Sequence, residues 1–294
     1  MININTKHSK IIKKLYLLIL LFVCSEISLS AQSLNAEPLT YFEVSRIYSK
    51  ISVSTNGDIY LLSSKDCLVD RFDSKGKLLS TFGGKGSGSQ FLNDPKSIWT
   101  QNDLKIYIAD YGNNRITLLT KELGFISTFN NFSNTYFTEE FRYPIFVSVM
   151  YNSDILVLDS ENRNFIRYNQ QLLKLEKFGG IESGNNQLVS PSEVYAGKNE
   201  LAVVDDADST LKFFNYFGSP TSKIKYHGFS IYDFGFGWIE LRNNALFQLT
   251  KNLPSFLDLN FLIDDKIIDL AMVGSKLYCV TPTKVVVLNV TTKN

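Results

Sequence analysis

The chain has 294 residues and a formal net charge of +1 at pH 7, because 30 Lys and Arg nearly balance 29 Asp and Glu. Nucleic-acid-binding domains usually carry a clear basic excess, so this balance speaks against a nucleic-acid partner. The length suits one large all-β domain or two ordinary domains, and no Pro- or Ser-rich linker divides the chain.

The first segment, residues 1–31, has the pattern of a signal peptide. Its positive n-region carries four lysines: Lys7, Lys10, Lys13 and Lys14. The apolar run LYLLILLFV at 15–23 follows, and the small residues in SLSAQ at 28–32 predict cleavage near Ser30 or Ala31. The run is shorter than the roughly 20 residues that a membrane-spanning helix needs. We therefore expect a secreted or periplasmic protein.

Cleavage at this point changes the charge of the chain. Four Lys and one Glu are lost, so the net charge of +1 becomes −2 for residues 32–294. No later stretch is apolar enough for a membrane span, so we expect none after cleavage. A lipid anchor on Cys24 is the alternative, although Val23 stands where a lipidated cysteine normally follows a small residue.

One short strand-like motif recurs along the rest of the chain. It reads DIYLLS at 58–63, KIYIAD at 105–110, DILVLD at 154–159 and ELAVVD at 200–205, with a weaker copy, KLYCVT, at 276–281. The first four copies are spaced by 47, 49 and 46 residues. Self-similarity with a period in the forties is typical of repeat architectures, propellers included.

Each repeat contains the same four apolar runs, bounded by Asn, Asp and Gly, which predict strands and turns. A proline opens the first run in three repeats, at Pro95, Pro144 and Pro191, where no ladder hydrogen bond is lost. Four short antiparallel strands per repeat predict one blade of a β-propeller. Blades one to four cover 47–84, 95–131, 144–180 and 191–227, and a degenerate blade five covers 229–263.

Blade six supplies only three strands before the chain ends, at 267–274, 276–282 and 284–290. The segment LTYFEV at 39–44 lies upstream of blade one and has no other place in the pattern. We predict that it is the missing outer strand of blade six, because an unpaired edge beside KVVVLNV (284–290) would promote aggregation. The predicted fold is a single all-β, six-bladed propeller over residues 32–294, closed by an N-terminal strand.

The segment GKLLSTFGGKGSGSQFLNDPKSIWTQNDLKIYIADYGNNRI at 76–116 resembles the NHL repeat. In that family a Gly-rich stretch, a Phe, a Pro-led strand and a turn of the form Asp-x-x-Asn-x-Arg-Ile recur in this order. The resemblance is strong in blade two, fair in blades one, three and four, and weak in blades five and six. It implies a six-bladed propeller but no single function, since the family includes binding modules, RNA-binding domains and a few lyases.

Asp110, Asp159 and Asp205 occupy the same position, the end of the second strand, in three successive blades. A catalytic group is needed once, whereas an architectural group is needed in every unit. An Asp at a strand end can accept backbone N–H bonds from its own turn. We therefore predict that these three residues are structural.

In a four-stranded blade, the turn between strands two and three points to the same face as the crossover to the next blade. The crossovers at 83–94, 131–143 and 181–190 therefore share a face with the Asp110 turn. Irregular loops on a rigid scaffold often bind ligands, although these loops could also do no more than connect the blades. The candidate binding residues on this face are Asn113, Asn114, Arg115, Arg142, Arg163 and Lys85.

The sequence offers little for catalysis. After cleavage His227 is the one remaining histidine, too few for the zinc site of NHL-related lyases or for a supported catalytic triad. A calcium site of the lactonase type needs only oxygen ligands near the central channel, for which Glu193 and Asp269 are candidates. Cys67 and Cys279 fall in neighbouring blades, so a disulfide and two free thiols both fit the pattern.

These observations favour a non-catalytic binding or scaffolding propeller without a cofactor. Its expected partner is a protein, peptide or glycan of the cell envelope or secreted space, bound on the face that carries the crossovers. The alternative is a calcium-dependent, lactonase-type hydrolase with the metal in the central channel.

Overall fold

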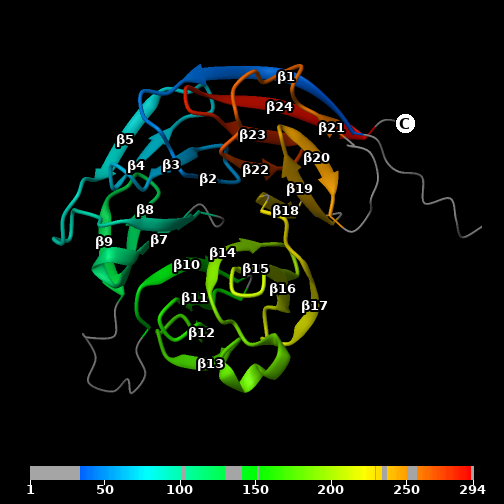
Figure 1. Ribbon diagram of the computed structural model, residues 1–294. Helices are drawn as coiled ribbons and strands as arrows, with labels where there is room; N and C mark the ends of the chain where they lie inside the picture. The colour runs from blue at the N-terminus through cyan, green and yellow to red at the C-terminus, as the bar shows by residue number, and fades with distance from the viewer. Residues whose placement is uncertain are drawn as a thin grey trace, which may run out of the picture.

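The computed structural model describes residues 34–100, 104–129, 141–150, 152–228, 230–233, 237–249 and 257–292. These residues form six four-stranded antiparallel sheets, the blades of a propeller (Figure 1). The predicted fold class is therefore confirmed. The predicted signal peptide and most of the crossover at 131–143 lie outside the described residues. No helix in these ranges is long and apolar enough to cross a membrane.

The first three blades follow one another along the chain. Blade one contains β2 (Lys50–Val53), β3 (Ile59–Ser63), β4 (Leu68–Phe72) and β5 (Leu78–Gly83). Blade two contains β6 (Pro95–Trp99), β7 (Lys105–Asp110), β8 (Arg115–Thr120) and β9 (Phe125–Phe129). Blade three contains β10 (Pro144–Val149), β11 (Ile155–Asp159), β12 (Asn164–Tyr168) and β13 (Lys174–Phe178).

The remaining blades complete the ring. Blade four contains β14 (Pro191–Ala196), β15 (Glu200–Asp205), β16 (Thr210–Asn215) and β17 (Pro220–Lys225). Blade five contains β18 (Ser230–Asp233), β19 (Trp238–Arg242), β20 (Ala245–Gln248) and the short β21 (Leu257–Asp258). Blade six contains β22 (Asp269–Val273), β23 (Lys276–Val280), β24 (Lys284–Thr292) and β1 (Leu34–Glu43).

The second strand of each blade is buried because both of its faces pack against neighbouring blades. All five residues of β3 and all five of β11 are buried. This explains why the recurring motif is a nearly continuous apolar run and does not alternate between apolar and polar residues. The core is therefore divided into apolar layers between blades, and each layer takes side chains from two neighbours.

The two ends of the chain close the ring by pairing β1 with β24, which lie side by side in Figure 1. Phe42 pairs with Val285 and Glu43 with Lys284, so the predicted closure is confirmed. The pairing is longer than the sequence predicted. It continues past a bulge between Pro38 and Thr40 to the pair Leu34–Thr292, and Leu34 is buried in the core.

A layer of buried side chains seals the same seam between blades six and one. Val285 and Val287 of β24 pack in one cluster with Ile59 and Leu61 of β3, and Phe42 of β1 belongs to the same cluster. The first and last blades are thus joined by strand pairing and by apolar packing.

We use the term loop face for the end of the propeller that carries the turns between second and third strands and the crossovers between blades. Its described turns are 64–67, 111–114, 160–163, 206–209, 243–244 and 281–283, and its described crossover residues include 84–94, 141–143 and 179–190. Two of these segments contain short 3₁₀ helices, η1 (Tyr111–Asn113) and η3 (Ile181–Asn186).

Candidate functional site on the loop face

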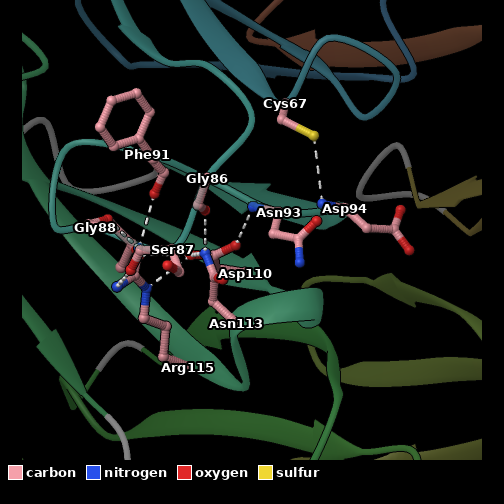
Figure 2. Close-up of polar contacts among 11 residues, drawn as sticks. Cys67, Gly86, Ser87, Gly88, Phe91, Asn93, Asp94, Asp110, Asn113 and Arg115 are labelled. Carbon is pink, nitrogen blue, oxygen red and sulfur yellow. Dashed lines mark hydrogen bonds and ion pairs between the residues drawn. The ribbon is translucent and has the colours of Figure 1, made fainter.

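The carboxylate of Asp110 is fully buried at the centre of a hydrogen-bond network (Figure 2). It accepts bonds from the backbone N–H of Asn93 at 2.8 Å and from Asn113 Nδ2 at 2.9 Å. Arg115 Nε donates to the same carboxylate at 2.7 Å, which forms a buried ion pair. Asp110 therefore ties its own turn to the crossover that leads into blade two.

The other donors of Asn113 and Arg115 also bind this crossover (Figure 2). Arg115 NH1 donates to Ser87 O at 3.1 Å, and NH2 donates to Gly88 O at 2.9 Å and Phe91 O at 2.8 Å. Asn113 Nδ2 donates to Gly86 O at 2.9 Å. Both side chains were predicted as binding residues. In the structure they hold the crossover in place.

Asn114 connects blade two to blade three. It adopts a left-handed conformation with φ 53°, and its Oδ1 accepts a bond from the backbone N–H of Tyr143 at 2.7 Å. Cys67 holds the matching position in blade one with φ 55°, and its sulfur accepts a longer bond from Asp94 N at 3.4 Å (Figure 2). Cys67 and Cys279 are both buried free thiols, so no disulfide joins them.

In blade four the buried turn aspartate is paired with a lysine instead of an arginine. Asp205 accepts bonds from Val189 N at 2.8 Å and Ser190 N at 2.9 Å, and Lys212 Nζ lies 2.5 Å from its Oδ2. Burial alone would raise the pKa of Asp205. Lys212 and the two N–H groups outweigh this effect and hold the pKa below its usual range.

Blade three lacks such a cation. Asn164 occupies the position of Arg115, and Asp159 is fully buried with bonds from Asn162 N at 2.9 Å and Asn162 Nδ2 at 2.5 Å. Burial raises the pKa of Asp159, since these bonds only partly offset the loss of solvent. Among the three blades that carry a turn aspartate, blade three therefore departs from the other two, because no described cation pairs with Asp159.

A polar groove of 680 Å³ lies at this departure. Its lining comes from the turn of blade three, from β13 and from the crossovers on either side: Arg142, Glu161, Asn162, Arg163, Asn164, Lys177, Gly180, Ile181, Glu182, Gln187 and Leu188. We call this the blade-three groove. It brings together two of the nominated residues, Arg142 and Arg163, whereas Lys85, Asn113, Asn114 and Arg115 lie outside its lining.

The side chains of the groove differ in how far they are already engaged. Arg142 is exposed and lies 3.7 Å from Glu161, which is a loose ion pair. Arg163 is exposed and makes no ion pair with any residue that the structure describes. Asn164 is 9% exposed, and its Oδ1 is buried without a hydrogen-bond partner. The lining residues of the groove thus include a guanidinium without a described ion pair, that of Arg163, and a hydrogen-bond acceptor without a partner, Oδ1 of Asn164.

The sequence pattern did not nominate Glu161, Asn162, Lys177 or Gln187 as lining residues. The signal that could have found the groove is the double replacement in blade three, where Asn164 stands at the position of Arg115 and Ile166 at the position of Lys212. Alignment of the repeats shows this replacement, but it becomes informative only once the buried role of Arg115 is known.

The central channel is the second cavity, with a volume of 280 Å³ and walls formed by inner strands. Asp269 lies in it, and its oxygens accept bonds from Ile51 N at 2.8 Å and from the Tyr232 hydroxyl at 2.9 Å. Glu193 accepts a hydrogen bond from the Tyr195 hydroxyl. The described residues contain no group of three or more His, Cys, Asp or Glu side chains that could hold a metal.

Comparisons with known proteins relate the chain to others through its fold. No family model matches the sequence, and no curated protein does. A catalytically inactive histidine-to-alanine variant of virginiamycin B lyase from Staphylococcus aureus, solved with quinupristin, matches with a TM-score of 0.55 and 13% identity. The match covers 87% of this chain and 99% of the lyase chain.

A streptogramin B lyase structure matches similarly, with a TM-score of 0.55 and 14% identity over 82% of this chain and 78% of that one. The chain is therefore a six-bladed β-propeller that resembles virginiamycin B lyase at distant identity. Likeness at this level establishes the fold alone.

Proposed function

We propose that this chain is a secreted or periplasmic NHL-like propeller that serves as a non-catalytic binding or scaffolding module. Its partner is a protein, peptide or glycan of the cell envelope, and the blade-three groove on the loop face receives it. The observation that carries the proposal is the coincidence of the 680 Å³ groove with blade three, whose turn aspartate, Asp159, has no described ion-pair partner, unlike Asp110 and Asp205. Local departures from a repeat are expected where a function has replaced an architectural contact.

The charge and exposure of the groove support a binding role. Arg142 and Arg163 are exposed there, and neither is held in a buried network like that of Arg115. Residues available at a loop surface can change partners at little cost in folding free energy, because surface ion pairs contribute only about 0–1 kcal/mol. A rigid sheet scaffold then fixes the position of the loops, as in many binding proteins.

The histidine content supports the non-catalytic part of the proposal. The lyase variant with a similar fold is catalytically inactive after the loss of one histidine. In this chain His227 is exposed just beyond the end of β17 and lines neither the blade-three groove nor the channel.

A pull-down from envelope extract tests the proposal. The mature chain is the bait, and the variant Arg142→Ala/Arg163→Ala removes two positive charges from the groove. The variant Lys75→Ala/Lys77→Ala removes the same charge from the turn between β4 and β5, at the opposite end of the blades, and serves as a matched control. We expect the wild type and the control to capture the same species and the groove variant to lose it.

Three results would contradict the proposal. The first is equal capture by all three baits, and the second is capture of nothing by the wild type. The third is about one calcium ion per chain by elemental analysis together with turnover of a lactone, which would point to the lactonase-type hydrolase instead.

A further inference from the structure

Two tyrosines form an aromatic ledge beside the blade-three groove, Tyr111 from the turn of blade two and Tyr143 from the crossover into blade three. Their ring centroids lie 5.3 Å apart, and Tyr143 is 45% exposed. Lys96 Nζ lies 5.1 Å from the centroid of Tyr111, and an ion pair of 2.8 Å with Asp94 holds the ammonium group in place. Lys96 thus contacts the ring of Tyr111, and the exposed ring of Tyr143 packs against Tyr111 and offers a surface for stacking.

The ledge is held firmly to the rim of the groove. Tyr143 directly follows Arg142, which lines the groove, and the Tyr143 carbonyl accepts a bond of 2.7 Å from Ser160 Oγ in the turn of blade three. The backbone of Tyr143 is left-handed with φ 50°. Asp94 has the same conformation at the equivalent position with φ 49°, so the backbone is a repeat feature and the exposed aromatic ring is particular to blade three.

The groove next to the ledge has the mixed donors and acceptors that a hydroxyl-rich molecule requires. The amides of Asn162, Asn164 and Gln187 lie among its lining residues. The buried Oδ1 of Asn164 has no hydrogen-bond partner, and such an acceptor is costly to leave unsatisfied. A ligand hydroxyl supplies both a donor for an acceptor of this kind and acceptors for the amide N–H groups.

The charged residues of the groove favour an acidic ligand. Three basic side chains, Arg142, Arg163 and Lys177, face two acidic ones, Glu161 and Glu182. The guanidinium of Arg163 is exposed, and its planar fork matches a carboxylate in a bidentate arrangement.

We infer that the aromatic ledge and the blade-three groove bind an acidic oligosaccharide. A sugar ring stacks on Tyr143, its hydroxyls bond to the amides of the groove, and a uronic acid carboxylate pairs with Arg163. This inference rests on the proposed function and narrows its partner to a glycan.

Isothermal titration of the mature chain with three probes tests the inference: tetragalacturonate, neutral cellotetraose and a hexaglutamate peptide. We expect tetragalacturonate to bind at least tenfold more tightly than either of the other two. Tyr143→Asn should weaken this binding tenfold or more, because asparagine tolerates the left-handed backbone but removes the ring. Tyr143→Phe should retain the binding, and Arg163→Gln should reduce the preference for tetragalacturonate over cellotetraose.

The matched control is Tyr41→Asn, which removes a more exposed tyrosine, 67% exposed, from β1. It should bind like the wild type. The inference is overturned if neither oligosaccharide binds, if Tyr143→Asn binds as tightly as Tyr143→Phe, or if hexaglutamate binds most tightly, which would indicate an acidic peptide. Should these titrations fail while the groove-dependent pull-down captures a protein, the glycan inference falls and the proposed function stands.

Discussion

Replacing Arg115 by methionine should destabilise the protein, because it leaves a carboxylate buried without its cation. Asp110 is fully buried and Arg115 is 7% exposed. The change removes the ion pair at 2.7 Å and the three bonds to the carbonyls of Ser87, Gly88 and Phe91. Methionine retains much of the apolar stem, so the loss is mainly electrostatic. Breaking one side of a buried pair typically costs about 3–5 kcal/mol of unfolding free energy.

Urea denaturation and thermal unfolding measure this loss. At about 2–4 °C per kcal/mol for domains near this size, the melting temperature should fall by roughly 10 °C. Arg163→Met is the matched control, since Arg163 is exposed in the equivalent loop of blade three and should change stability by less than about 0.5 kcal/mol. The double variant Asp110→Asn/Arg115→Met should recover part of the loss, because the orphaned charge is removed as well.

The reasoning is refuted if Arg115→Met is as stable as the wild type. It is also refuted if Asp110→Asn/Arg115→Met is less stable than Arg115→Met, so that the two substitutions destabilise the protein independently. Either result would mean that the charge of Asp110 does not depend on Arg115.

The remaining predictions concern closure, acid dependence and the thiols. A chain that lacks β1 should aggregate or fail to fold, and removal of residues 32–37 alone should also lower the urea midpoint, because Leu34 and its neighbours pair with β24. Asp205→Asn should lose about 3–5 kcal/mol at pH 7 by orphaning Lys212, and this difference should shrink as the pH falls below about 4, since the pKa of Asp205 is lowered in the folded state. Asp159→Asn should behave in the opposite way and gain stability relative to the wild type as the pH rises from about 4 to 7, since burial raises the pKa of Asp159. In a chain of residues 32–294, thiol titration should find two reactive groups, Cys67 and Cys279, after denaturation and close to none in the native state; a single bridged pair in the denatured state would contradict the structure.

The six-bladed propeller could be predicted because its strands produce local sequence patterns that recur along the chain. Buried second strands produce nearly continuous apolar runs, and the spacing of these runs sets the number of blades. The recurrence of Asp110, Asp159 and Asp205 at the end of the second strand could also be recognised from the sequence, because it is a local pattern in three successive blades. The start of β1 was not predicted, because the sequence analysis placed the strand at 39–44, whereas it begins at Leu34 and continues through a bulge between Pro38 and Thr40.

The partners of the turn aspartates were harder to predict, because the same contact is made from different positions. Arg115 lies five residues after Asp110, whereas Lys212 lies seven residues after Asp205. Positions two apart on a strand share one face, so either can reach the carboxylate. A fixed motif therefore finds Arg115 and overlooks Lys212.

The blade-three groove depends on contacts between segments that no local pattern joins. Arg142 and Arg163 could be nominated as basic loop residues, but their shared groove also needs the lining from Gly180 to Leu188. The ledge requires Tyr111 and Tyr143 to meet across two blades. Such juxtapositions arise from the closed ring, so they appear only when the blades are placed.

The most direct test of a binding site on the loop face is hydrogen exchange of a chain of residues 32–294 with and without the species captured in the pull-down. We expect slower exchange in residues 141–146 and 160–164, which carry the ledge and the turn of blade three. Exchange in the turn at 73–77, at the opposite end of the blades, should stay unchanged. Protection confined to that turn, or no protection anywhere on the loop face, would show that the partner does not bind at the blade-three groove.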